Sequence, residues 1–382
     1  MSEGNYEVIV VGGGVMGSAT AWHLARDGKR TLLLEQFEIA HNHGSSHGES
    51  RIFRVAYPKV WYTRLALQAK EHWRELEREA GEPLLRVTGG MDFADDEAGY
   101  ADVNAVATSL ASTRRPYESY DWARLARRYP QWRMMEGVVA VYSPESGALN
   151  PTRCVQVLAA RAAAHGCEIH EQERVTQIIP RPDGVELTTD KGKYSAARLV
   201  LTAGAWAKEL LSQIGLNLPL KVTQEQTVHF RPRANAESFA PGKFPVWIHY
   251  RKEAVYGFPV LGEQGVKVAF HKDGPTIDIE EYRQEPRACV RDRLRAYLER
   301  YLPDAAGEAF GELTCLYTNT PDEGFILDVA PGNPQIVVGS PCSGHGFKFA
   351  AGIGRALADL ATKGTTDMEV GHLGIARFVK AG

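Results

Sequence analysis

One stretch near the start of the chain limits the possible fold more than any other. Residues 6–11 are apolar and largely β-branched, which predicts a buried parallel strand. The pattern G-x-G-x-x-G follows at once over Gly12–Gly17, at the expected start of a helix. A second strand, Thr31–Leu34, then runs into Glu35, which follows Gly12 by 23 positions. This order predicts a Rossmann-type unit that binds a dinucleotide, with Glu35 on a ribose.

The glycines of this pattern have separate physical roles. Gly12 permits the tight turn, Gly14 lets the backbone approach a pyrophosphate, and Gly17 lets helix and strand pack closely. The helix, expected from about Met16 to Arg26, supplies free N–H groups and the positive end of its dipole at its N-terminus. The alternative interpretation is a glycine-rich turn with a solvated Glu35.

Composition excludes several classes of protein. The chain has 382 residues with 44 Lys and Arg against 47 Asp and Glu, a net charge of −3. That balance gives no electrostatic footprint for nucleic acid or an anionic membrane surface. No apolar run reaches the roughly 18 residues that a membrane helix needs, and the acidic start lacks the features of a signal peptide. Five scattered cysteines without a C-x-x-C pair favour a reducing compartment, so we expect a cytoplasmic protein.

Three histidines lie close together in the segment after the second strand. His41, His43 and His47 raise the possibility of a metal site, but no second group of ligands stands nearby in the sequence. The segment is rich in glycine and serine, which is typical of a loop pressed against a ligand. We therefore expect no metal here.

The rest of the chain alternates between two kinds of structure. Helices are expected near residues 62–80 and 152–165, and the regular spacing of Trp73 in the first of these places it in the core. Residues 218–314 carry short alternating segments, typical of an antiparallel sheet, before a helix over Ala288–Tyr301. A strand at Gln335–Gly339 leads into a second glycine-rich loop and helix.

These elements predict a mixed α/β fold with one interrupted domain. Residues 1–86, 151–217 and 315–382 would form a discontinuous, Rossmann-type cofactor-binding domain. Residues 87–150 and 218–314 would form an inserted, mainly antiparallel substrate domain.

Four segments together resemble one family, the monomeric sarcosine oxidase family of flavin-dependent amine oxidases. The resemblance extends from residue 7 to about residue 362, and its later segments are more specific than the first. The segments are Gly12–Gly17, His43–Arg54 (HGSSHGESRIFR), Cys315–Asp328 (CLYTNTPDEGFILD) and Ser343–Phe349 (SGHGFKF).

The resemblance implies FAD in an extended form, linked covalently through a thioether to Cys315. By the residues alone Cys315 is an ordinary strand cysteine, and Cys342 is the competing attachment site. The expected cofactor-binding residues are Gly12, Gly14, Val15, Met16, Gly17, Glu35, Gln36, Ser45, His47, Arg51, Val175, Gly204, Cys315, Gly344, Gly346, Phe347 and Lys348.

The resemblance also implies the groups that act on the substrate. Arg54 and Lys348 would clamp a substrate carboxylate, and Lys267 would be the cation that activates oxygen; a planar fork and a point charge suit these tasks. From the residues alone, Lys267 is equally consistent with a solvated strand position. The residues expected around the reacting atoms are Lys267, Arg54, Lys348, His271, Tyr256, Tyr317 and His345.

Three departures from the family pattern concern the substrate. The chain reads Val-Ala-Tyr-Pro after Arg54, Ser46 replaces a common histidine, and Trp247 stands where a smaller side chain is expected near the substrate. The resemblance thus implies a monomeric FAD oxidase of sarcosine-like secondary amino acids that reduces O₂ to hydrogen peroxide. Pipecolate, proline, N-methyltryptophan and glycated amino acids are alternative substrates. A flavin dehydrogenase with another acceptor and a non-catalytic flavin-binding subunit are the alternative functions.

Overall fold

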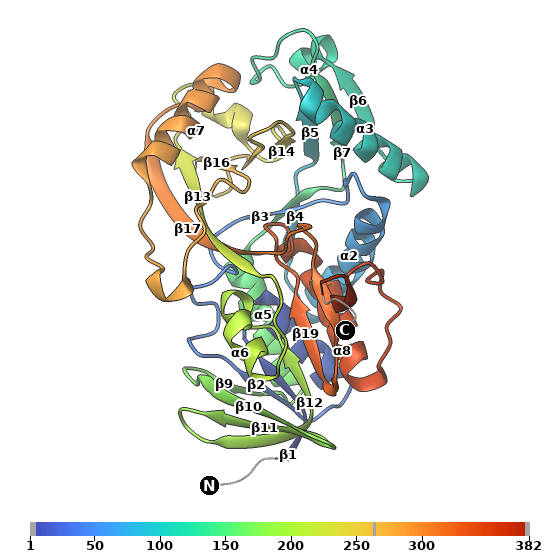
Figure 1. The fold of residues 1–382 in the computed structure, drawn as a ribbon. Coiled ribbons are helices and arrows are strands. Elements are labelled where there is room, and N and C mark those ends of the chain that lie inside the picture. The colour runs from blue at the N-terminus through green and yellow to red at the C-terminus, as the bar shows by residue number, and fades with distance from the viewer. Residues whose placement is uncertain (1–4, 263–264, 379–382) are drawn as a thin grey trace.

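The computed structural model describes residues 5–262 and 265–378, and two large sheets dominate it. Figure 1 shows the first sheet in the lower part of the molecule and the second in the upper part. The strands of the first sheet are β1 (Asn5–Val11), β2 (Thr31–Leu34), β9 (Glu168–His170), β10 (Val175–Arg181), β11 (Gly184–Thr189), β12 (Lys193–Leu201), β18 (Ile326–Ala330) and β19 (Asn333–Ser340).

The centre of the first sheet is parallel. Strand β1 lies between β12 and β2, β9 continues beyond β2, and β19 pairs with the end of β12, all in parallel. Strands β10, β11 and β18 join with antiparallel pairing. Alternate residues of β1 pack on opposite faces: Val8 and Val10 face one hydrophobic core, and Ile9 faces another. Burial on both faces explains why the strand has no polar alternation.

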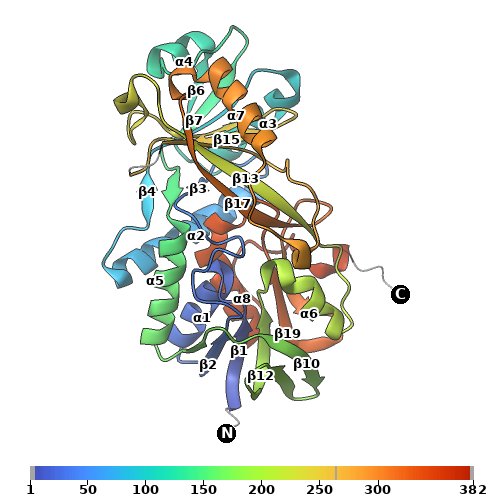
Figure 2. The ribbon, with the colours of Figure 1, turned by 90° about the vertical axis from the view of Figure 1, so that its left-hand side faces the viewer.

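Helices cover both faces of this sheet. Residues of α1, α2, α5 and α8 pack with Val8 and Val10, and residues of α6 pack with Ile9. Figure 2 shows α1, α5 and α8 together beside the strands, with α6 apart from them. The bounds of these helices are α1 (Val15–Arg26), α2 (Val60–Ala80), α5 (Pro151–Ala164), α6 (Ala207–Gln213) and α8 (Ala350–Lys363).

The second sheet is antiparallel except for the pair β14–β5. Its strands, in spatial order, are β17 (Ala309–Asn319), β13 (Lys221–Phe230), β16 (Val266–Phe270), β15 (Val255–Phe258), β14 (Val246–His249), β5 (Gly90–Ala94), β7 (Val139–Ser143) and β6 (Glu118–Asp121). Three helices accompany it: α3 (Glu97–Ser112), α4 (Trp122–Arg128) and α7 (Ala288–Tyr301).

Two long strands link the upper and lower parts. Strands β13 and β17 pair antiparallel, from Lys221 with Asn319 to Phe230 with Ala309. Both belong to the second sheet, and one end of this pair extends towards the first sheet (Figure 1). The boundary that we place between residues 314 and 315 falls inside β17, so Cys315 belongs to a strand of the second sheet. A small third sheet contains β3 (Arg51–Phe53), β8 (Gly147–Leu149) and β4 (Leu85–Val87).

The predicted α/β class is confirmed, and several elements match closely. The helix Ala288–Tyr301 and the strand Thr31–Leu34 have the predicted bounds. Trp73 is fully buried, as its spacing predicts. Residues 87–150, which we assign to the inserted domain, contain strands β5, β6 and β7 of the second sheet and helices α3 and α4. Within the described ranges, no helix has both the length and the apolar character required to cross a membrane.

Candidate active site

A cavity of about 830 Å³ is lined by residues of both large sheets. From the first sheet it receives the carboxyl ends of β1, β2 and β19, at Val11, Leu34 and Ser340. From the second sheet it receives Tyr256 on β15 and Tyr317 on β17. The carboxyl ends of parallel strands are where α/β folds bind ligands, and the volume suits a cofactor together with a small substrate.

The glycine loop at the start of α1 has the geometry that its pattern predicts. Gly12 has φ +99°, and a Cβ on it would lie 2.6 Å from the Thr202 carbonyl oxygen. A Cβ on Gly17 would collide with the Gly12 carbonyl, so Gly17 serves close packing and does not line the cavity. Gly14 does line it, and a Cβ there would meet only Ser46 Oγ, at 3.3 Å.

Glu35 lies at the end of β2 and ties this loop to the sheet. Its carboxylate accepts hydrogen bonds from the N–H groups of Gly13 at 2.6 Å and Phe37 at 2.9 Å. Burial raises the pKa of Glu35, and these backbone hydrogen bonds oppose the rise. His41 Nε2 lies 3.6 Å from Glu35 Oε1, so this histidine of the glycine-rich segment faces the carboxylate.

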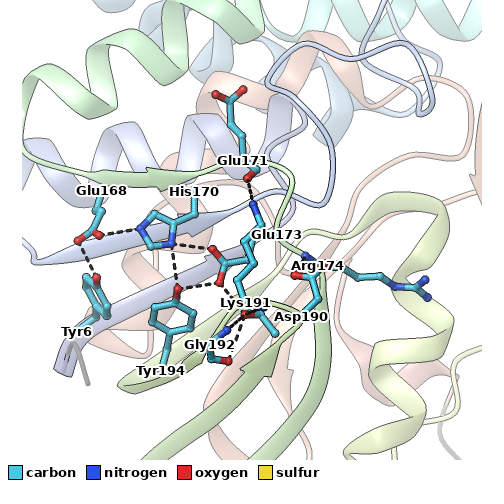
Figure 3. Close-up of polar contacts among 11 residues, drawn as sticks. Tyr6, Glu168, His170, Glu171, Glu173, Arg174, Asp190, Lys191, Gly192 and Tyr194 are labelled. Carbon is cyan, nitrogen blue, oxygen red and sulfur yellow. Dashed lines mark hydrogen bonds and ion pairs between the residues drawn. The ribbon is translucent and has the colours of Figure 1, made fainter. Parts of the chain in front are cut away.

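A network of polar side chains around His170 and Glu173 lies next to Glu35 in the structure. Figure 3 shows the contacts within this network. His170 Nδ1 lies 3.0 Å from Glu173 Oε2, and Glu173 also accepts hydrogen bonds from Thr189 at 2.6 Å and Tyr194 at 2.7 Å. The Glu173 N–H donates to the Glu35 carbonyl at 2.8 Å. Since Glu173 and Val175 line the cavity, the network fixes the wall beside Glu35.

Cys315 faces the cavity from β17 and is buried. Burial raises the pKa of its thiol, and the positive charges of Arg51 and Lys267 oppose the rise. Cys342, which also lines the cavity, has its sulfur engaged: Sγ accepts the N–H of Thr318 at 3.2 Å. Cys315 has no such hydrogen bond among the described residues. All five cysteines are free thiols.

Arg54 and Lys348, the two predicted carboxylate ligands, meet at one aromatic ring. Arg54 Cζ lies 4.1 Å and Lys348 Nζ 5.6 Å from the centre of the Tyr57 ring. Lys348 Nζ donates to the His345 carbonyl at 2.7 Å, and the Lys348 carbonyl accepts from Trp73 Nε1 at 2.8 Å. Burial and the neighbouring Arg54 lower the pKa of Lys348 well below its ordinary value.

Arg54 has a partner that the sequence does not reveal. Its Nη1 donates to Asp92 Oδ1 at 2.7 Å and to the Tyr250 hydroxyl at 2.6 Å. Asp92 lies on β5 and is 2% exposed. Burial raises the pKa of Asp92, and the Arg54 guanidinium opposes that rise. Asp92 is missed in sequence because it falls in residues 87–150, whose pattern indicates no site.

Lys267 lies behind the cavity wall. It is 3% exposed, and its Nζ donates to the carbonyl of Ser50 at 2.9 Å and to Ser50 Oγ at 3.2 Å. The side chain is therefore not solvated. Burial and the charge of Arg51 lower the pKa of Lys267 to about 7. His47 is also buried away from the cavity surface, and burial lowers its pKa to about 4.

The structure otherwise gathers the predicted residues around one cavity. The predicted residues that line it are Gly12, Gly14, Val15, Met16, Glu35, Gln36, Ser45, Arg51, Arg54, Val175, Gly204, Tyr256, His271, Cys315, Tyr317, Gly344, His345, Gly346, Phe347 and Lys348. Only Gly17, His47 and Lys267 of the predicted set do not reach its surface.

The placement of Trp247 near the substrate is wrong. Trp247 points away from the cavity and packs against Trp132 and Phe244 in the core of the upper part. Its neighbour on β14, Ile248, lines the cavity instead. Because side chains alternate along a strand, a shift of one residue exchanges the two faces.

Several lining residues were not predicted. Tyr62 is assigned by its spacing to the apolar face of α2, yet it lines the cavity. Trp206, at the end of a short 3-10 helix (Gly204–Trp206), also lines it, as do Tyr57 and Tyr250, which lie in loops where spacing carries no signal. The departure Val-Ala-Tyr-Pro after Arg54 contains Tyr57 and is the one feature that could have pointed to it.

Unpartnered polar atoms show that the cavity suits FAD and a polar substrate. Tyr57, Tyr62, Ser340 and His345 line the cavity, and the buried hydroxyls of the first three and Nδ1 of His345 have no hydrogen-bond partner within the described part of the chain. Buried polar groups require partners, so these atoms call for a ligand. The glycine cradle at Gly14 and the adjacent helix N-terminus suit a pyrophosphate.

Comparison with known proteins agrees with this cavity. A family model described as FAD dependent oxidoreductase matches residues 7–360. Monomeric sarcosine oxidase from Streptomyces avermitilis is 37% identical, over 98% of each chain. Monomeric sarcosine oxidase from Bacillus sp. (strain NS-129) is 34% identical, over 98% of this chain and 97% of the relative. The structure of NikD, an unusual amino acid oxidase essential for nikkomycin biosynthesis, superposes with a TM-score of 0.86 at 26% identity, over 97% of each chain.

Proposed function

This chain belongs to the FAD dependent oxidoreductase family and is a flavin-dependent amine oxidase; on that premise we propose that it oxidises secondary amino acids related to sarcosine. The observation that carries the proposal is the meeting of Arg54 and Lys348 over the Tyr57 ring, in the cavity that also contains Cys315. A forked guanidinium and an ammonium suit one amino-acid carboxylate.

A bound FAD would supply the acceptor for a hydride from the carbon next to the substrate nitrogen, and its reoxidation by O₂ would give hydrogen peroxide. The resulting imine hydrolyses, and for sarcosine the products are glycine and formaldehyde. Gly14 and the α1 N-terminus would hold the pyrophosphate, and Glu35 the ribose. Arg54 and Lys348 would orient the substrate by its carboxylate.

The reacting amine must be uncharged to lose a hydride, and the residues around it favour that state. His271 lines the cavity, and burial lowers its pKa to about 3, so it adds no positive or negative charge at neutral pH. The positive charge of Arg54, which lines the same cavity, disfavours an ammonium ion nearby. Tyr256 and Tyr317 present hydroxyls to the same space.

Lys267 would act on oxygen through the wall, as a positioned cation. Its Nζ is held by Ser50, and Ser50 directly precedes the cavity-lining Arg51. A buried positive charge stabilises negative charge that develops on oxygen. We further propose that Cys315 carries the flavin through a thioether; its thiol lines the cavity, whereas Cys342 Sγ is already hydrogen-bonded.

The alternative substrates to sarcosine are pipecolate, proline, N-methyltryptophan and glycated amino acids. Ile248, rather than a tryptophan, lines the substrate region, which favours a pocket with room for more than a methyl group. We propose a monomer, because the two bacterial relatives are monomeric sarcosine oxidases.

A peroxide assay with the purified yellow protein tests the proposal across these amines. We expect substrate-dependent bleaching of the flavin without oxygen, and peroxide when air is admitted. A colourless protein, or one bleached by none of these amines, would show that the proposed substrate class is wrong. Bleaching without peroxide would identify a dehydrogenase with another electron acceptor.

A further inference from the structure

The charged groups at the substrate end of the cavity do not all favour an anion. Arg54 and Lys348 are cationic candidates, but Asp92 forms a buried ion pair with Arg54 through Oδ1 and Nη1 at 2.7 Å. The two side chains are 12% and 3% exposed. Asp102 on α3 also lines the cavity, but it is exposed and screened by water.

Only one edge of the Arg54 guanidinium is occupied. Nη1 carries both hydrogen bonds, to Asp92 and to Tyr250, whereas Nη2 and Nε donate to no residue in the described ranges. Arg54 lines the cavity, so its remaining donors are available to a ligand. A guanidinium has five N–H donors in a fixed fork, so one edge can hold Asp92 while the other binds a second carboxylate.

Asp92 has no other cation to balance it. Arg54 is its only salt-bridge partner among residues 5–262 and 265–378. Beside it lies a second, partly open space of about 10 Å³, lined by Arg54, Ser146 and Trp247 as well as by Ile52, Met91 and Val246, which holds one water at most. Asp92 does not itself line the main cavity, so its negative charge acts on a bound ligand through its ion pair with Arg54, which does line it.

We propose that Asp92 determines substrate specificity by matching this end of the cavity to a ligand with a single carboxylate. A bound carboxylate favours the charged form of Lys348, so with Arg54 positive and Asp92 negative one ligand carboxylate makes this group of charges neutral. A second carboxylate would leave an uncompensated negative charge in a buried site, which is costly. This inference rests on the proposed function, because it assumes that Arg54 receives the ligand carboxylate.

The test measures ligand binding to the holoenzyme and does not require turnover. Butanoate, succinate and succinamate have similar backbones; succinate alone has a second charge, and succinamate replaces it with a neutral amide. Each is titrated at pH 7.5 while the flavin absorbance spectrum is recorded. For the unaltered protein we expect succinate to bind about tenfold or more weakly than succinamate, the order of magnitude for a like charge in a partly desolvated site.

Two variants test whether Asp92 causes this difference in Kd between succinate and succinamate. Asp92→Asn keeps the shape and an acceptor for Arg54 but removes the charge, so the succinate-to-succinamate ratio of Kd values should fall about tenfold. Tyr250→Phe removes the other hydrogen bond of Nη1 without changing charge, so it should weaken all three ligands alike. Asp92→Ser is the substitute if Asp92→Asn does not fold.

The outcomes separate this inference from the proposed function. An unchanged ratio in the Asp92 variants, or equal binding of succinate and succinamate to the unaltered protein, overturns the inference even when secondary amines bleach the flavin. Absence of any spectral change with all three ligands also overturns it, because Arg54 then does not receive carboxylates. If no Asp92 variant folds, equal binding of succinate and succinamate to the unaltered protein still overturns the inference.

Discussion

Gly14 offers a substitution that separates cofactor binding from folding. Its φ of −63° and ψ of −178° are open to alanine, so Gly14→Ala introduces no backbone strain. The new Cβ would touch only Ser46 Oγ, at 3.3 Å, and would otherwise project into the cavity. Ser46 Oγ accepts the Val15 N–H at 3.1 Å, and disturbing this helix cap costs at most about 1 kcal/mol.

The effect on FAD binding should be much larger. A methyl group at this position prevents the backbone from approaching the pyrophosphate. Displacing the phosphate from two N–H donors, each charge-assisted bond contributing about 1.5–3 kcal/mol, removes about 3 kcal/mol or more. This corresponds to a Kd for FAD at least about 100-fold higher.

Gly17→Ala is the matched control. Its Cβ would collide with the Gly12 carbonyl and lie 2.6 Å from Thr202 Oγ1, so the apoprotein should lose about 1–3 kcal/mol of stability. With an unfolding entropy of about 2.1 cal/mol/K per residue, the Tm should fall by about 1–4 °C. Gly14→Ala should lower it by no more than about 1 °C.

The assay compares thermal unfolding of the apoproteins with FAD titration by quenching of flavin fluorescence. Both variants are made in a Cys315→Ser background, so that binding is reversible. If Gly14→Ala binds FAD as tightly as the parent protein, the loop does not hold the pyrophosphate. If Gly14→Ala unfolds at as low a temperature as Gly17→Ala, the conclusion that an added Cβ has room at Gly14 is wrong.

Further predictions concern chemistry and pH. Lys267→Met should slow flavin reoxidation by O₂ far more than flavin reduction, which stopped-flow traces of each half-reaction resolve; equal slowing would refute its role. Because burial and Arg51 lower the pKa of Lys267 to about 7, its charged form prevails below that pH, so reoxidation should slow as pH rises through about 7, and Lys267→Met should abolish this dependence. Acid precipitation should leave the yellow colour in the protein pellet, and Cys315→Ser should release it into the supernatant; release from the parent protein would exclude a covalent link. Trp73→Phe removes the hydrogen bond to the Lys348 carbonyl, and a rise in substrate KM with little change in FAD binding should follow; an unchanged KM would show that this bond does not position Lys348.

Patterns with a local physical cause could be read from the chain directly. The strand before Gly12 is largely apolar because both of its faces are buried. The helix Ala288–Tyr301 could be predicted because its apolar residues recur at helical spacing. Trp247 shows the limit of such reasoning. Comparison with the family pattern implied a place near the substrate, but the pleat of β14 turns Trp247 to the core and presents Ile248 instead.

The dinucleotide-binding unit and the α/β class could be predicted from the sequence, because turns, helix starts and buried strands depend on residues close together in the chain; the predicted residues at the substrate end came from the family resemblance. The ion pair of Asp92 with Arg54 at the substrate end of the cavity, and the buried position of Lys267 beside Ser50, depend on tertiary structure alone. Asp92 and Arg54 are 38 residues apart, and Lys267 and Ser50 are 217 apart. Their contacts arise where separate strands are packed into one sheet or against its neighbours, and no period or spacing along the chain encodes which side chains then meet.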